Sequence, residues 1–83
     1  MPSIQKILET MRTSRNSVRF TDALKVCTYY FGRPRVSGSH HVFKTPWKGE
    51  PWVNIQDKQG FVMPYQVRQI LDAVDKLEIE NDV

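Results

Sequence analysis

Apolar residues recur at helical spacing in the first third of the chain. The first set occupies one face of a helix: Ile4, Ile7, Leu8 and Met11. Ser3 can cap this helix, and the polar stretch 13–17 ends it. A second helix starts at Thr21 or Asp22 and stops at Gly32, because glycine permits a left-handed C-cap. The sequence therefore predicts two N-terminal helices.

The pattern then changes to that of short strands. We expect one strand at 41–45, a second at 52–57, where apolar and polar residues alternate, and a third at 61–63. The loop 45–51 contains two prolines and a glycine, which interrupt any ladder of hydrogen bonds. A tight turn at 57–60 favours antiparallel pairing of the strands that it joins.

The final element is an amphipathic helix that begins near Pro64, a residue suited to the first turn of a helix. Its apolar stripe is Val67, Ile70, Leu71, Val74 and Leu77. The predicted fold class is therefore α+β, with N-terminal helices, a three-stranded antiparallel sheet and a C-terminal helix. Helices packed on one face of such a sheet would leave its other face open.

Length and composition restrict the possible classes of protein. With 83 residues, 40% of them hydrophobic, the chain forms a single folded domain over 1–83. The one cysteine, Cys27, excludes a disulfide framework and a multi-cysteine zinc site, and its apolar neighbours place it in the core. No apolar run is long enough for a membrane span or a signal peptide. We expect a cytoplasmic protein that uses no membrane and no cofactor.

Charge is divided unevenly along the chain. Residues 1–60 carry 10 Lys/Arg and 4 Asp/Glu, whereas residues 61–83 carry 2 and 5, within a net charge of +3. A basic body suits an anionic partner such as nucleic acid. A solvated surface with an acidic tail explains the same charges equally well.

The segment 33–44 concentrates the candidate chemistry. It places two adjacent histidines among three cations: Arg33, Arg35, His40, His41 and Lys44. Histidine exchanges protons near neutral pH, and cations stabilise the charge of a phosphate in its transition state. Such a set could cut RNA without a metal ion, by activating the ribose 2′-hydroxyl against the adjacent phosphate. Two solvent-facing or core-edge histidines are the plainer interpretation.

The two histidines have different expected positions. Neighbours on a strand point to opposite faces, so His40 and His41 cannot readily bind one metal ion together. If Phe43 enters the core, His41 shares its face, and His40 is the accessible histidine, on the same face as Lys44.

The segment GSHHVFK at 38–44, followed by Pro46, resembles the glycine-serine-histidine strand of HicA-type toxins, small bacterial ribonucleases of type II toxin–antitoxin systems. The segments VMP at 62–64 and VRQIL at 67–71 are similar to the third strand and final helix of that family. The resemblance covers 33–77 and leaves 1–20 as an N-terminal helical extension.

The resemblance implies a fold like that of double-stranded-RNA-binding domains and a toxin that cuts mRNA and so blocks translation. It places the catalytic histidine at His40, with His41 as second choice, and implies an antitoxin partner of the HicB type that covers the active site. Trp47 and Trp52 are candidates for stacking on bases, or for contacts with a sheet edge or a protein. The predicted RNA-binding residues are Arg33, Arg35, Ser39, Lys44 and Lys48.

The chain also departs from the family pattern. The loop before the final helix is much shorter, and Tyr65 stands where a histidine is usual. A second catalytic group is therefore unassigned. Two other functions stay open: a non-catalytic RNA-binding module that uses the Arg33–Lys44 stretch, and a protein-interaction domain that uses the final helix and the tryptophans.

Overall fold

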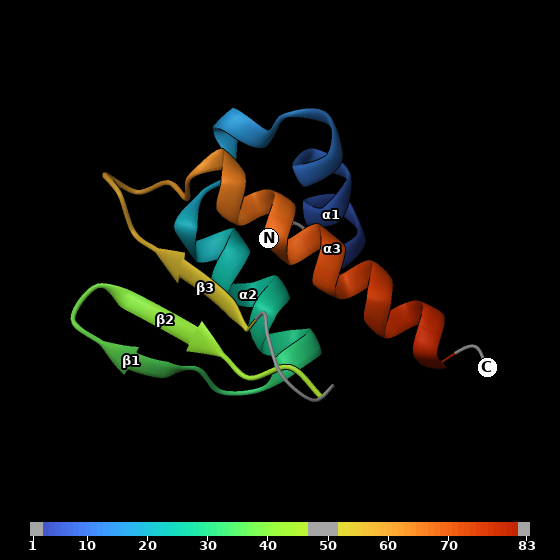
Figure 1. The fold of residues 1–83 in the computed structure, drawn as a ribbon. Coiled ribbons are helices and arrows are strands. Elements are labelled where there is room, and N and C mark those ends of the chain that lie inside the picture. The colour runs from blue at the N-terminus through green and yellow to red at the C-terminus, as the bar shows by residue number, and fades with distance from the viewer. Residues whose placement is uncertain (1–2, 47–51, 82–83) are drawn as a thin grey trace.

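The computed structural model describes residues 3–46 and 52–81, and it has the predicted α+β layout. Three helices gather on one side of a three-stranded antiparallel sheet, and the sheet order is β1-β2-β3 (Figure 1). The helices are α1 (Ile4–Thr13), α2 (Phe20–Phe31) and α3 (Pro64–Asn81), with a 3-10 turn η1 (Arg15–Ser17) after α1. The strands are β1 (Arg35–Ser37), β2 (His40–Phe43) and β3 (Val53–Gln56).

Helix ends follow from local chemistry. Ser3 caps α1 through its hydroxyl, which accepts a hydrogen bond from the Lys6 backbone N–H at 3.2 Å. α2 ends at Gly32, as predicted, although with φ at +85° and ψ at −155° this glycine is not in the left-handed helical conformation that was expected. Pro64 opens α3, also as predicted, and Gln66 in the first turn of α3 accepts a hydrogen bond from the Met63 backbone N–H at 3.1 Å. This bond is the glutamine half of a capping box.

The core lies between the helices and one face of the sheet. Its fully buried side chains come from every helix and from strands β2 and β3, and they include Met11, Val26, Cys27, Phe43, Val53, Ile55, Val67, Ile70 and Val74. Val53 and Ile55 alternate with the less buried Asn54 and Gln56, which are therefore on the opposite, open face.

The prediction of strands at 41–45, 52–57 and 61–63 was wrong about the last of these. Segment 61–63 lies against 18–20 instead, where the Val62 N–H donates to the Val18 carbonyl at 3.1 Å and the Phe20 N–H donates to the Gly60 carbonyl at 2.9 Å. The outer edge of β3 is closed to it, because α3 side chains occupy that edge. The third strand is β1, which comes before the others in the chain.

Two glutamines of α3 take the place of a fourth strand. The Asn54 N–H donates to Gln69 Oε1 at 3.0 Å, and the Gln56 N–H donates to Gln66 Oε1 at 3.4 Å. The amides of residues 54 and 56 thus point away from β2. Hydrogen-bonding direction alternates along an antiparallel strand, so His41 of β2 directs its backbone polar groups toward its partner Ile55 on β3. Val36, the partner of His41 on β1, therefore directs its own backbone polar groups outward from the sheet.

The β1–β2 hairpin extends beyond the helices. In the described residues, β1 contacts β2 and no helix, and its Val36 side chain is 57% exposed. A two-residue turn at Gly38 and Ser39 joins the strands. Gly38 has φ at +59°, and a positive φ at the first central residue is what a type II′ hairpin turn requires.

Candidate nucleic-acid interface

The open face of the sheet brings the basic segment 33–44 and β3 together. His40 and Val42 of β2 pair with Ser37 and Arg35 of β1, respectively. On the other side of β2, the same two residues pair with Gln56 and Asn54 of β3. Two residues further along each segment, outside the paired strands, Arg33, Lys44 and Trp52 line one cavity, and we count them as a third row. From the hairpin turn outward, the rows are Ser37, His40 and Gln56; then Arg35, Val42 and Asn54; and last Arg33, Lys44 and Trp52. We call these nine residues the open face.

A cavity marks the end of the open face that lies away from the turn. It encloses about 410 Å³ and is lined by Arg33, Pro34, Arg35, Val42, Lys44 and Trp52. Trp52 is 37% exposed, so part of its indole can be reached from solvent. The cavity therefore joins three cations to an aromatic surface, and the open face carries no carboxylate. We call it the cationic cavity.

His40 lies in the row next to the hairpin turn and is exposed to solvent. The turn itself is attached to β3, because Gln56 Nε2 donates a hydrogen bond to Ser39 Oγ at 3.1 Å. The Ser39 hydroxyl retains its own proton for donation to an anion. His40 is thus an accessible imidazole on an anchored hairpin, one row from Arg35.

His41 points the other way, as predicted from its neighbour Phe43. Its ring is half-buried and meets the Phe20 ring edge to face, with ring centroids 5.0 Å apart. In the described part of the chain, its Nδ1 is buried and has no hydrogen-bond partner. His41 therefore packs between the sheet and α2, on the side of the sheet opposite to the open face.

The remaining predicted residues divide into two groups. Arg33, Arg35, Lys44 and Trp52 are brought together at the cationic cavity. Trp47 and Lys48 lie outside the described residues. Sequence reasoning missed Gln56 as an anchor of the turn, although its alternation with the buried Ile55 already placed it on the open face.

Cys27 belongs to the core, as predicted. Its side chain is fully buried, and burial raises the pKa of its thiol to about 12. A thiol in that state is protonated at neutral pH and is a poor nucleophile. Nucleophilic catalysis by Cys27 is therefore not supported.

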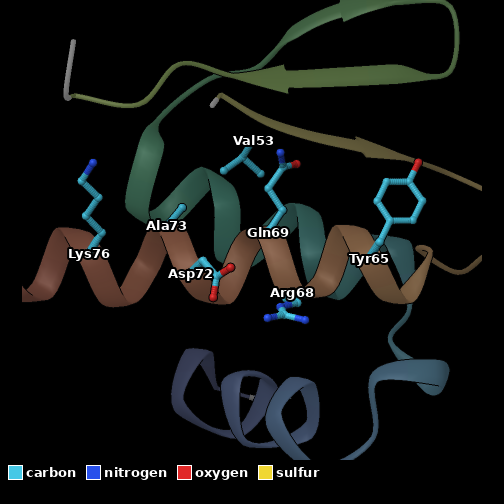
Figure 2. Close-up of a pocket in the computed structure, with 7 residues that line it drawn as sticks. All are labelled: Val53, Tyr65, Arg68, Gln69, Asp72, Ala73 and Lys76. Carbon is cyan, nitrogen blue, oxygen red and sulfur yellow. The ribbon is translucent and has the colours of Figure 1, made fainter. Parts of the chain in front are cut away.

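A second cavity, of about 330 Å³, lies on the opposite side of β3, where α3 closes the sheet (Figure 2). Charges of both signs follow one another along α3 there, and Arg68 turns away toward α1. The lining residues are Val53, Tyr65, Arg68, Gln69, Asp72, Ala73 and Lys76. This cavity lacks the single sign of charge found on the open face.

Within residues 3–46 and 52–81, no three histidine, cysteine, aspartate or glutamate side chains are grouped to hold a metal ion. Over the same residues, no helix is both long and apolar enough to cross a bilayer. Comparison of the chain with family models, with curated proteins and with solved structures finds no match.

Proposed function

We propose that this protein is an endoribonuclease that cuts mRNA on the open face of its sheet, with His40 as the proton-transfer residue. The observation that carries the proposal is the position of His40. It is an exposed imidazole on the same face as Arg33, Arg35 and Lys44, while its neighbour His41 is turned into the packing. The sequence resemblance to HicA-type toxins supports the same function.

The proposed reaction needs a base and a stabilised phosphate. Neutral His40 accepts the proton of a ribose 2′-hydroxyl, whose oxygen attacks the adjacent phosphorus. A bond forms between the 2′-oxygen and phosphorus, and the bond from phosphorus to the 5′-oxygen breaks, which leaves a 2′,3′-cyclic phosphate. The departing 5′-oxygen takes a proton from water. Arg35, one row away, stabilises the charge that develops on the phosphate oxygens.

In the cell, the proposal makes this protein the toxin of a toxin–antitoxin pair. Cutting mRNA would stop translation, and a HicB-type antitoxin would restrain the enzyme by covering the open face. Because this face carries cations and no carboxylates among the described residues, an antitoxin that covers it would present acidic groups.

The test uses purified protein and a structured mRNA in excess chelator. We expect fragments with 2′,3′-cyclic phosphate ends from the wild type and none from His40→Ala. Since His40 is exposed, the two proteins should unfold at the same urea concentration. His41→Phe is the matched control and should still cut. Fragments from His40→Ala at the wild-type rate would refute the role of His40.

A non-catalytic RNA-binding module is the second candidate. One observation favours this candidate. In the described residues, no titratable side chain forms a hydrogen bond with His40, so none is placed to assist proton transfer by its imidazole. This candidate predicts salt-sensitive RNA binding without fragments. The loss of binding would then be shared among Arg33→Ala, Arg35→Ala and Lys44→Ala, with little effect of His40→Ala.

A further inference from the structure

We infer that the cationic cavity is a subsite for one unpaired nucleotide, so that the open face binds single-stranded RNA and not duplex RNA. The inference deepens the proposed function and rests on it for the identity of the polymer. The cationic cavity is separate from His40 and lies at the end of the open face that is away from the hairpin turn.

The lining of the cavity matches the two chemical parts of a nucleotide. Trp52, Val42 and Pro34 offer apolar and aromatic surface to the flat face of a base. Arg33, Arg35 and Lys44 surround that surface with positive charge for a phosphate. A guanidinium can hold two phosphate oxygens at once, and two of the three cations are arginines. A volume of about 410 Å³ lies within the usual range of small-ligand pockets.

The position of the aromatic residue favours a single strand. Bases within a duplex stack on one another, so their faces cannot reach a side chain unless they leave the helix. In an unpaired strand the bases can turn outward and stack on an exposed aromatic residue of a sheet. Trp52 lies on the same face of the sheet as Asn54 and Gln56, with part of its indole accessible.

The row order connects this subsite to His40. Val42 lines the cavity and follows His40 by two residues on β2, which is about 7 Å along an extended strand. A base held against Trp52 and Val42 would thus place the neighbouring part of its strand over the row of His40. The strand would run along β2, from the cationic cavity toward the hairpin turn.

The experiment uses the full chain with Trp47→Phe, which leaves Trp52 as the sole tryptophan. The probe is a 2′-O-methyl hexa-adenylate, which has no free 2′-hydroxyl and cannot be cut by the proposed reaction. We expect the probe to quench Trp52 fluorescence, and its duplex with the complementary strand to bind at least 10-fold more weakly. Arg35→Ala should weaken binding of the single strand about 10-fold or more.

The matched control is Lys6→Ala, because Lys6 is an exposed cation on α1, outside the open face. It should leave the affinity within a factor of two. Three results would overturn the inference: equal affinity for the duplex, binding of the probe without any change in Trp52 fluorescence, or equal competition by poly-glutamate. The last result would indicate an acidic protein partner and not a nucleotide.

Failure of the subsite and failure of the nuclease give different results. If the wild type binds the probe but leaves ordinary RNA intact, the nuclease is refuted and the subsite stands. If Trp52→Leu and Arg33→Ala cut ordinary single-stranded RNA at the wild-type rate, the subsite is refuted and the nuclease stands.

Discussion

Phe20 of α2 and His41 of β2 meet edge to face, with their ring centroids 5.0 Å apart and their planes inclined by 68°. This contact fixes which of the two adjacent histidines is available to solvent. Once His41 is packed against α2, the alternation of the strand turns His40 to the open face. The accessible imidazole is thus selected by the packing of its neighbour.

We predict that His41→Phe keeps the stability of the protein and that His41→Ala lowers it. A phenyl ring keeps the edge-to-face contact and removes a buried nitrogen that has no partner in the described residues. The urea midpoint should stay level or rise for His41→Phe. For His41→Ala, the free energy of unfolding should fall by about 1–3 kcal/mol. Equal loss in both variants would show that the ring does not act by packing.

Gln66 should be more important for stability than Gln69. Gln66 is 2% exposed, and its Oε1 accepts hydrogen bonds from the backbone N–H groups of Met63 and Gln56. Gln66→Met leaves both groups without this acceptor, at a cost of about 1–3 kcal/mol in the free energy of unfolding.

Gln69→Met is the matched control for that variant, because Gln69 is less buried and accepts one N–H, that of Asn54. Its cost should be at most about 1 kcal/mol. Chemical denaturation measures both variants, and a larger loss for Gln69→Met would contradict the assignment of Gln66 as the main cap of this edge.

Gly38→Ala should impair both stability and RNA cleavage. Nothing lies within 4 Å of an added Cβ at this position, so the cost arises from the backbone, whose φ is +59°. We expect a loss of about 1–2 kcal/mol. Relaxation of the turn would also displace His40, two residues along the chain.

Gly60→Ala provides the comparison, since Gly60 also has a positive φ, +91°, and open space around it, but lies in the turn after β3. It should lose similar stability and keep its cleavage rate per folded molecule. A matching drop in cleavage for both variants would mean that the effect is one of stability alone.

Cys27 should react with a thiol reagent only when the protein opens. At pH 8 its thiol is both buried and protonated, because burial raises its pKa to about 12. Ellman's reagent should react slowly with the native protein and rapidly in denaturing urea. Fast reaction under native conditions would contradict the buried position.

The same thiol makes stability depend on alkaline pH. Between its ordinary pKa of 9.0 and about 12, the unfolded chain ionises Cys27 and the folded chain does not. The folded state then holds the extra proton, so its stability should fall as the pH rises through this window. Cys27→Ala should remove that part of the decrease, as measured by urea denaturation at pH 8 and pH 10.5.

Periodicity was sufficient to predict the helices and a small α+β domain that starts and ends with helices, whereas the details of the sheet were expected from the family resemblance. It failed at β1, because Arg35, Val36 and Ser37 have neither the apolar run nor the burial of a core strand. β1 exists because Gly38 permits a tight turn that pairs it with β2. At 61–63, by contrast, a strand was expected where none joins the sheet, because Gln66 and Gln69 already occupy the edge of β3. No local pattern in the sequence reveals that contact.

The candidate site was predictable in part for a similar reason. Alternation around Phe43 separates His40 from His41 without knowledge of the fold. The meeting of Trp52 with Arg33 and Arg35 is not local, because it depends on the register of three strands. The sequence marks the residues, and only the pairing of the strands shows that they line one cavity.

The glutamines that close β3 also limit how native copies of this protein can associate. Extension of a sheet from molecule to molecule needs two free edges on each copy, and here α3 side chains occupy one of them. The outward-facing backbone of Val36 leaves β1 as the edge that can accept another strand. Two copies that paired there would each have only a closed edge left, so edge-to-edge growth of the folded protein would end at a dimer and could not become a fibre.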